Sequence, residues 1–390
     1  MKVISVQTMR DLDRRTIEQG TPGKVLMERA GRGVFREIKQ FLKRLHGNHC
    51  QQVVVFAGKG NNGGDAFVVA GLLAEETPLP VKVYAMAPKK DLPGDAREFA
   101  EKLPGKVSYS VIKTKRPENL LNAGDFVVDG LLGTGISGPL KAPYDTLIKY
   151  INTSRCPVVS IDIPSGLNGD TGEIATDAVL SDLTVTMAFP KRGMLSANGL
   201  RKCGELRCID IGIDSQAPHS AEVAGEALFA RDIAALLKRR PSDGHKGTFG
   251  TTLTIGGSRQ FVGAPVLSGT AALRSGCGLS TVLIPDGIRQ FISAAPQALI
   301  FIPVPDKGEG ILNDAGRNTL KEALNATDSI VLGPGIGRAA ETAEALAAVL
   351  ATEKPLLIDA DALRLTAGKK EEIKKVQNLI LTPHPGEMQV

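Results

Sequence analysis

Residues 52–75 read QVVVFAGKGNNGGDAFVVAGLLAE, a strand, a turn and the start of a helix in direct succession. Val53 to Ala57 are apolar and mostly β-branched, which is typical of a buried strand. Four glycines follow, mixed with two asparagines and an aspartate, before apolar residues recur at helical spacing. A glycine-rich turn between a strand and a helix start lets backbone N–H groups approach an anion. The stretch therefore predicts an α/β fold with a ligand site at this turn.

The glycine spacing by itself does not identify the ligand. Gly58-x-Gly60-x-x-Gly63 matches a dinucleotide fingerprint, but a tight strand-to-helix turn without any ligand can show the same pattern. An NAD dehydrogenase would carry an acidic residue at the end of the next strand. Here residues 81–86 are followed by Ala-Pro-Lys-Lys at 87–90, and the lysines could meet a phosphate. An NADP-dependent oxidoreductase is therefore one hypothesis.

The composition limits the class of protein. A length of 390 residues indicates about two domains, and 42% hydrophobic with 23% charged residues is a globular balance. A net charge of +5, 4% aromatic residues and no tryptophan do not favour nucleic-acid binding. No apolar run approaches the ~18 residues of a membrane span, and the N-terminus has no apolar signal core. Five cysteines without a CxxC pair predict reduced thiols and a cytoplasmic location.

Strand and helix patterns alternate along both halves of the chain. We expect domains at 1–220 and 227–390, each a mainly parallel sheet with helices on both faces. In the first half the expected helices are 6–19, 22–42, 65–75, 95–103 and 144–151, and the expected strands 53–57, 81–86, 125–129, 157–161, 183–187 and 206–209. Beyond it we expect helices at 230–237, 262–275 and 339–350, and strands at 251–255, 279–284, 329–332, 355–358 and 379–381.

Polar residues follow three of the expected strands of the first half. Asn62 and Asp65 follow the first, Asp129 ends the strand at 125–129, and Asp162 and Ser165 follow the strand at 157–161. A single aspartate at such a place could be a helix cap or a turn former. Three polar strand ends that share one sheet edge would surround a crevice with amide, hydroxyl and carboxylate oxygens. They predict a hard-cation site beside a ligand site.

The motifs KGNNGGDA, VVDGLLGTGISG and DIPSGLNGDTG, in this order, resemble the N-terminal domain of bifunctional NAD(P)H-hydrate repair enzymes. The resemblance implies a Rossmann-like, doubly wound NAD(P)H-hydrate epimerase that inverts the hydroxyl-bearing carbon of the damaged nicotinamide ring. It makes Asp162 the candidate catalytic residue and a hydrate contact. It implies potassium bound by Asn62, Asp129 and Ser165. Further implied hydrate contacts in this half are Asn61, Asn62, Gly63, Gly64, Asp65, Gly133, Thr134, Gly135, Ile136, Ser137, Gly138, Pro139 and Tyr144.

One residue departs from the family pattern of the first half. The family usually has glycine after the aspartate of the first motif, where this chain has Ala66. Alanine is the better helix former, so we expect a small effect unless the position requires a positive φ.

The second half carries the motifs DGHKGTFG, GPGIG, IDADAL and TPHPGE, which as a set resemble the ADP/ATP-dependent NAD(P)H-hydrate dehydratase, a ribokinase-like domain. Singly, such motifs have plainer explanations, such as Asp361 as a helix cap. The resemblance implies that Ala264, Gly335 and His384 contact the hydrate, and that ADP or ATP with magnesium drives its dehydration. The nucleotide strand and the glycine-rich anion hole of the family are not found in the sequence. We therefore expect the ribokinase-like domain to be C-terminally incomplete and its activity to be absent from residues 1–390.

Two further hypotheses stay open at the level of sequence. One is the NADP-dependent oxidoreductase, which would change absorbance at 340 nm with an alcohol or carbonyl substrate. The other is a catalytically inactive nucleotide-binding scaffold, although Asn62, Asp129, Asp162 and Ser165 favour an enzyme. A small-molecule nucleotide is the expected partner, with neither nucleic acid nor membrane, and a homo-oligomer could form.

Overall fold

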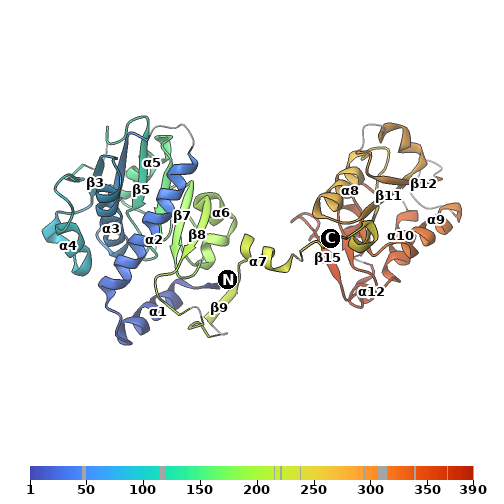
Figure 1. The fold of residues 1–390 in the computed structure, drawn as a ribbon, viewed down its shortest axis with the longest axis horizontal. Helices are drawn as coiled ribbons and strands as arrows, with labels where there is room; N and C mark the ends of the chain where they lie inside the picture. The colour runs from blue at the N-terminus through green and yellow to red at the C-terminus, as the bar shows by residue number, and fades with distance from the viewer. Residues whose placement is uncertain are drawn as a thin grey trace. The chain divides into compact units, whose positions relative to one another are not determined.

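The computed structural model describes residues 1–45, 50–114, 119–136, 138–214, 216–219, 222–237, 239–292, 296–305, 314–337, 340–366 and 368–389. The chain forms two compact units, Met1–Leu237 and Lys238–Val390 (Figure 1). The sequence placed the boundary earlier, between 220 and 227. The first unit continues because β9 (Val223–Glu226) pairs antiparallel with β1 (Lys2–Ile4) and so returns to the N-terminus.

The first unit is built on a parallel seven-stranded sheet. In spatial order its strands are β4 (Ser108–Val111), β3 (Val81–Ala85), β2 (Gln52–Ala57), β5 (Asp125–Gly130), β6 (Val158–Ile161), β7 (Leu183–Met187) and β8 (Glu205–Ile209). The chain runs outward from β2 to β4 and then crosses back to place β5 on the other side of β2. The order therefore reverses between β2 and β5, as in a doubly wound fold.

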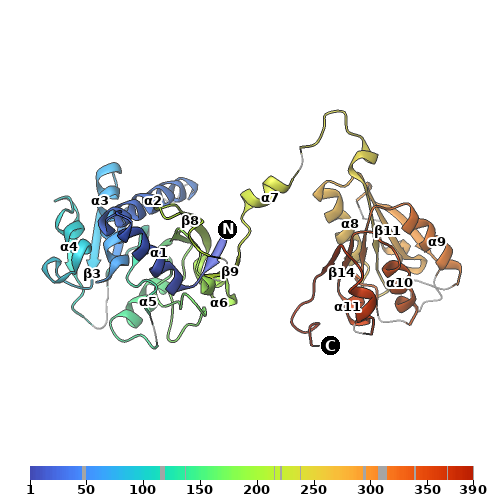
Figure 2. The same ribbon diagram turned by 90° about the horizontal axis from the view of Figure 1, so that it is seen from below.

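Helices cover both faces of this sheet, and the residues of β2 show why. Val53 and Val55 pack into one apolar cluster with the first helices, whereas Val54 and Phe56 pack into another with α5. Alternate residues of a strand point to opposite faces, so a fully apolar strand must be buried on both sides. In Figure 2, α1 to α4 lie on one side of the unit and α5 on the other. The helices are α1 (Val6–Glu18), α2 (Gly23–Arg44), α3 (Asn61–Glu76), α4 (Gly94–Glu101), α5 (Tyr144–Thr153), α6 (Ala197–Cys203) and α7 (Ala230–Leu236).

The second unit holds a parallel six-stranded sheet with helices on both faces. Its strands, in spatial order, are β12 (Ile300–Val304), β11 (Leu279–Pro285), β10 (Thr251–Ile255), β13 (Ser329–Leu332), β14 (Leu356–Ile358) and β15 (Leu379–Leu381). Its helices are α8 (Gly263–Ser275), α9 (Asp314–Asn325), α10 (Ala340–Leu350), α11 (Asp361–Thr366) and α12 (Lys370–Ile373). Helix α8 packs on one face of the sheet and α9 to α11 on the other.

The predicted α/β class and both parallel sheets are confirmed. Ser5 caps α1 as expected, because its side chain accepts a hydrogen bond from the backbone N–H of Thr8 at 3.0 Å. Edge strands were missed: β4 and β12 lie at sheet edges. The residues of β4, Ser-Tyr-Ser-Val, form no continuous apolar run, and the apolar run of β12 contains Pro303, which argues against a central strand. Among the described helices none is both long and apolar enough to cross a bilayer.

Candidate active site

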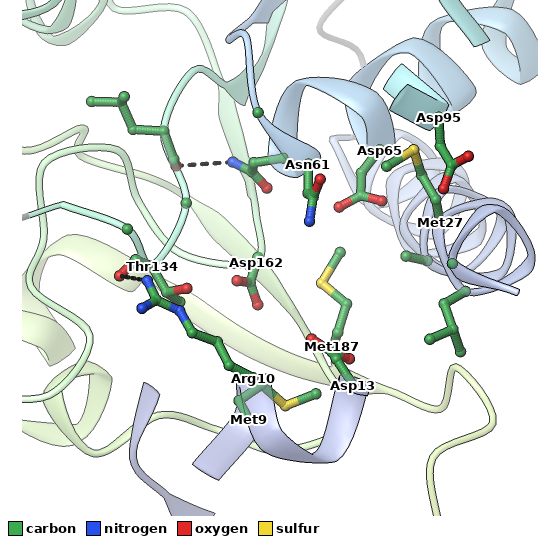
Figure 3. Close-up of a pocket in the computed structure, with 18 of the residues that line it drawn as sticks. Met9, Arg10, Asp13, Met27, Asn61, Asp65, Asp95, Thr134, Asp162 and Met187 are labelled. Carbon is green, nitrogen blue, oxygen red and sulfur yellow. Dashed lines mark hydrogen bonds between the residues drawn. The ribbon is translucent and has the colours of Figure 1, made fainter. Parts of the chain in front are cut away.

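The candidate site of the first unit lies where the strand order reverses. A cavity of about 560 Å³ opens at the carboxyl ends of β2, β5 and β6, which is where doubly wound sheets bind their ligands. Eight of the expected hydrate contacts line it. They are Asn61, Asn62, Asp65, Gly133, Thr134, Gly135, Tyr144 and Asp162. Figure 3 shows several of them around the cavity, together with side chains from α1 and α2.

The glycines of the first motif have different roles. A Cβ atom on Gly58 would lie 1.8 Å from the Leu131 carbonyl oxygen, and one on Gly63 would lie 2.1 Å from the carbonyl oxygen of Gly58. These two glycines therefore allow backbone to pack on backbone. A Cβ atom on Gly60 would meet nothing within 4 Å, and this glycine lines the cavity. Ala66 lies inside α3 and has no positive φ, so this departure from the family pattern is accommodated.

Some expected contacts do not line this cavity. Gly63 and Gly64 are buried, and a Cβ on Gly64 would meet the Met27 sulfur at 2.5 Å. Both glycines are closely packed against neighbouring atoms. Ile136, Gly138 and Pro139 belong to the loop between β5 and α5 but are not part of the cavity wall. Ser137 is outside the described residues.

Asp162 follows β6 and is held from two sides. Its backbone has a φ of 63°, and its N–H donates to the Val185 carbonyl at 2.8 Å. Its Oδ1 accepts hydrogen bonds from the Thr186 hydroxyl at 3.2 Å and from the Nζ of Lys191. Lys191 Nζ also donates to the Thr186 hydroxyl at 2.8 Å. The side chain of Lys191 is 1% exposed, so Asp162 is anchored to a buried ammonium group.

Asp13 on α1, Asp65 on α3 and Asp95 on α4 also line the cavity, and the first two have a raised pKa. Burial raises the pKa of Asp13 to about 6, with Lys191 opposing the rise and Asp162 adding to it. Burial raises the pKa of Asp65 well above its ordinary value, and the charges of Asp162 and Asp13 raise it further. In the part of the chain that the structure describes, neither Asp13 nor Asp65 has a hydrogen-bond or ion-pair partner. The pKa of both Asp13 and Asp65 is therefore raised, and that of Asp65 lies well above its ordinary value.

The three residues expected to bind potassium do come together. Ser165 donates to Asp129 through its hydroxyl at 2.6 Å and through its backbone N–H at 2.9 Å. The Leu132 carbonyl accepts from Asn62 Nδ2 at 2.9 Å and from the Ser165 hydroxyl at 3.2 Å. We call Asn62, Asp129, Ser165 and the Leu132 carbonyl the oxygen cluster. Ser160 and the Leu131 N–H complete the partners of the Asp129 carboxylate. Burial raises the pKa of Asp129, and these hydrogen bonds oppose the rise.

One buried atom of the oxygen cluster lacks a partner. Asn62 is 7% exposed, and its Oδ1 accepts no hydrogen bond from any described residue. A buried amide oxygen without a donor is costly, and such an atom often faces an ion. The described residues contain no group of three histidine, cysteine or acidic side chains that would suit a transition metal.

In the second unit, two of the three expected hydrate contacts are neighbours. Gly335 follows β13 with a φ of 67°, and a Cβ there would lie 3.2 Å from the Cβ of Ala264 in α8. His384 lies in the turn after β15 and its side chain is exposed. Its ring contacts are local: Nδ1 accepts from the Gly386 N–H at 3.0 Å, and Nε2 lies 3.4 Å from Glu387. The structure thus joins Ala264 to Gly335, and the described hydrogen bonds of His384 stay within its own turn.

Sequence reasoning missed Lys191, Asp13 and Arg10, which all face the cavity. Lys191 comes shortly after β7, in the run Phe-Pro-Lys at 189–191, so its place after an apolar strand was a usable signal. Asp13 and Arg10 are three residues apart on an amphipathic helix, and that spacing puts them on one face. Nothing in their local sequence distinguishes that face from a solvent-exposed one.

Two family descriptions match the chain. The family described as "YjeF-related protein N-terminus" matches residues 23–193, and the one described as NAD(P)H-hydrate dehydratase matches residues 252–390. Solved structures show weaker likeness. A yeast protein is 23% identical with a TM-score of 0.41, covering 50% of this chain and 83% of that one. The ADP/ATP-dependent NAD(P)H-hydrate dehydratase of Bacillus subtilis, co-crystallised with ATP/Mg²⁺, is 28% identical with a TM-score of 0.31, covering 40% and 52%.

Curated relatives extend over nearly the whole chain. A bifunctional NAD(P)H-hydrate repair enzyme of Moorella thermoacetica is 34% identical, covering 100% of this chain and 74% of the relative. One of Coxiella burnetii is 36% identical, covering 97% and 73%. One of Leishmania major is 34% identical, covering 93% and 67%. At this identity and coverage, the chain belongs to the family of bifunctional NAD(P)H-hydrate repair enzymes.

Proposed function

We propose that this protein repairs hydrated nicotinamide nucleotides. The first unit interconverts the R and S forms of hydrated NADH and NADPH, and the second unit belongs to the family of domains that dehydrate the S form with ADP or ATP. Family membership supports both activities, since matches to both domains are present in one chain. The observation that carries the epimerase assignment is the Asp162 carboxylate, fixed by Lys191 and open to the cavity at the sheet's switch point.

The chemistry of the hydrate fits such a carboxylate. A dihydronicotinamide ring is an enamine, and adding water to an enamine puts the hydroxyl on the carbon next to nitrogen. That carbon is a carbinolamine, which can exchange configuration when protons are removed and returned. A positioned carboxylate supplies this general acid–base catalysis. We therefore assign proton transfer to Asp162, and substrate contacts to the residues that line the cavity around it.

The rest of the cavity suits the remainder of a nucleotide. The N-terminus of α3 faces it at Gly60 and Asn61, and such a helix end favours negative charge. Arg10 and Lys59 add two cations to the lining. We propose that these groups bind the pyrophosphate of the nucleotide while its hydrated nicotinamide ring lies near Asp162. The contacts implied for Gly63, Gly64, Ile136, Gly138, Pro139 and Ser137 remain part of this proposal.

Potassium is proposed for the oxygen cluster, and the residues present fit it. Asn62 Oδ1 is a buried oxygen in need of a partner, and Ser165, Asp129 and the Leu132 carbonyl supply further oxygens next to it. A hard monovalent cation accepts a set of neutral oxygens with one carboxylate. When bound it would supply positive charge beside the cavity. The protein's own contribution is to hold the loop after β5 against the loop after β6 through the Leu132–Ser165 contacts.

For the second unit we propose a hydrate site that includes Ala264, Gly335 and His384, with ADP or ATP and magnesium as co-reactants. The match of residues 252–390 to NAD(P)H-hydrate dehydratases and the packing of Gly335 against Ala264 support it. We also propose a cytoplasmic location, supported by five cysteines that are all unpaired. Assembly into a homo-oligomer is a further proposal.

The test for the first unit is direct. Purified protein is incubated with one epimer of hydrated NADH, and the two epimers are separated by chromatography over time. Conversion faster than the spontaneous rate, and lost in Asp162→Asn, is expected. An NADP-dependent oxidoreductase would instead change 340 nm absorbance with an alcohol or carbonyl substrate and leave the epimer ratio alone. Adding ATP or ADP to the same reaction and following return of the 340 nm absorbance tests dehydration.

A further inference from the structure

The two oxygens of Asp162 have different surroundings. Both side-chain donors, Thr186 and Lys191, bind Oδ1. Among the described residues no hydrogen bond reaches Oδ2, although the side chain is 18% exposed and lines the cavity. The carboxylate is thus anchored by one oxygen and free at the other. Oδ2 is the atom that can take a proton from a bound substrate.

Lys191 is not available for any other role. Its side chain is 1% exposed, and its Nζ donates to Asp162, to the Thr186 hydroxyl and, at 3.5 Å, to the Met187 carbonyl. A buried ammonium group is stable only when it is paired and hydrogen-bonded. Lys191 therefore fixes Oδ1 of Asp162, and the carboxylate keeps its position beside the cavity.

Asp65 has the opposite environment. It projects from α3 into the same cavity, from a different element than Asp162 (Figure 3). No described residue donates a hydrogen bond to it or pairs with it. The charges that act on it are Asp162, Asp13 and, in the other direction, Lys191, while Arg10, Lys59 and Asp95 line the cavity further along. Two neighbouring negative charges and burial all favour a protonated carboxyl group.

We propose that Asp65 is the second catalytic residue of the epimerase, a neutral acid working with the Asp162 base, and that Lys191 is the positioning residue that keeps these roles apart. Two carboxyl groups held in different protonation states are a general way to supply an acid and a base at one pH. This inference rests on the proposed epimerase function and assigns its proton donor.

The proton transfers balance without a further reactant. Asp162 Oδ2 takes the proton of the hydroxyl group, the oxygen forms a carbonyl with its carbon, and the carbon–nitrogen bond of the ring breaks. The electron pair of that bond stays on nitrogen, which receives the proton of Asp65. Rotation about the adjacent carbon–carbon bond presents the other face of the carbonyl. Ring closure reverses both transfers, returning the protons to Asp65 and to the hydroxyl group with inverted configuration.

The experiment is the pH dependence of kcat/KM for epimerisation, measured on the full chain. In wild type kcat/KM should fall toward high pH, along a basic limb on which Asp65 loses its proton. Asp65→Asn should lower the rate by ~10²–10⁴-fold and remove the basic limb. Glu75→Gln, on the exposed end of the same helix, is the matched control and should leave the basic limb unchanged.

Lys191→Met should move the basic limb to higher pH, because the ammonium lowers the pKa of Asp65. A merely structural lysine would lower the rate without moving this limb. Thr186→Val removes the other donor to Oδ1 and should lower kcat/KM without moving the limb, because no charge is lost. Thr184→Val is its control, since Thr184 lies on the same strand and donates to the Cys203 carbonyl instead. If Lys191→Met does not fold, the comparison of Thr186→Val with Thr184→Val still tests whether the donors to Oδ1 position Asp162.

The outcomes separate two failures. A wild type that does not change the epimer ratio would overturn the proposed function and this inference with it. An active wild type, with an Asp65→Asn variant that keeps the basic limb and a rate within about twofold, would overturn the assignment of Asp65 alone. A basic limb that stays in place in Lys191→Met, or a Thr186→Val variant as active as Thr184→Val, would overturn the role of Lys191 and Thr186 in positioning Asp162.

Discussion

Replacing Asp13 by asparagine should stabilise the first unit at neutral pH. Asp13 lines the cavity, and within the described chain it has no hydrogen-bond or ion-pair partner. Burial raises its pKa to about 6, with Lys191 opposing and Asp162 adding to the rise. A carboxyl group whose pKa is higher in the folded than in the unfolded state destabilises the fold when it is ionised. At pH 7 its ionised form therefore opposes folding, and asparagine resembles the neutral form at every pH.

The size of the effect follows from the two pKa values. The pKa rises from the ordinary 3.8 to about 6, and at 1.36 kcal/mol per pH unit this corresponds to about 3 kcal/mol. Because part of the side chain reaches the cavity solvent, we expect about 1–2 kcal/mol, or a Tm higher by ~2–8 °C. The gain should be absent below about pH 4, grow between pH 4 and 6, and stay constant at higher pH.

Tyrosine fluorescence can follow the first unit alone. The chain has no tryptophan, and its four tyrosines, at 84, 109, 144 and 150, all belong to that unit. Urea unfolding of the full chain would be measured at pH 4 and pH 8 for wild type and Asp13→Asn. Asp11→Asn is the control on the same helix, since Asp11 pairs with the exposed Arg14 and contributes little. A variant no more stable than wild type at pH 8, or equally stabilised at pH 4, would refute the reasoning.

Three other predictions use the same site. Asp162→Asn should reduce epimerisation by ~10²–10⁴-fold, and wild-type turnover of the epimers by this variant would contradict the assignment. A thallium soak of crystals should give an anomalous peak at the oxygen cluster, and Ser165→Ala should weaken it; a map without the peak would count against potassium. Gly58→Ala should cost more than about 3 kcal/mol because of the Leu131 carbonyl, whereas Gly60→Ala should stay within about 1 kcal/mol. Equal unfolding midpoints for the two alanine variants would show that the backbone contact is not as close as described.

The sequence was a good guide to the central elements because they are buried on both faces. Every residue of the strand at 53–57 is less than 1% exposed. A short continuous apolar run is typical of a parallel strand that is buried on both faces. The edge strand β4 alternates between exposed and half-buried residues, and β9 is mostly exposed. Such short strands are specified by their pairing partner. The pairing of β9 with β1 joins residues more than 200 positions apart, and no local pattern encodes it.

The site could be predicted only where its residues follow strands. Asp129, Asp162 and Ser165 are recognisable because strand ends at one sheet edge must meet. The side chains supplied by α1 depend on how that helix packs across the sheet, so Asp13 looks like any polar helix residue. Lys191 is harder still, because a lysine is usually exposed, and only tertiary structure reveals that this one is buried beside Asp162.

The backbone at Asp162 links the fold to the chemistry. Its φ of 63° is one that non-glycine side chains rarely adopt, although aspartate and asparagine tolerate it better than most. The conformation is fixed by the N–H bond to Val185, and it turns the side chain back toward Thr186 and Lys191. Asparagine suits this φ at least as well, so Asp162→Asn should keep the backbone while leaving the Lys191 ammonium without its counter-charge. Glycine would relieve the backbone but remove the acid–base group altogether. The position therefore requires both a residue that accepts positive φ and a carboxylate, and aspartate is the side chain that meets the two demands together.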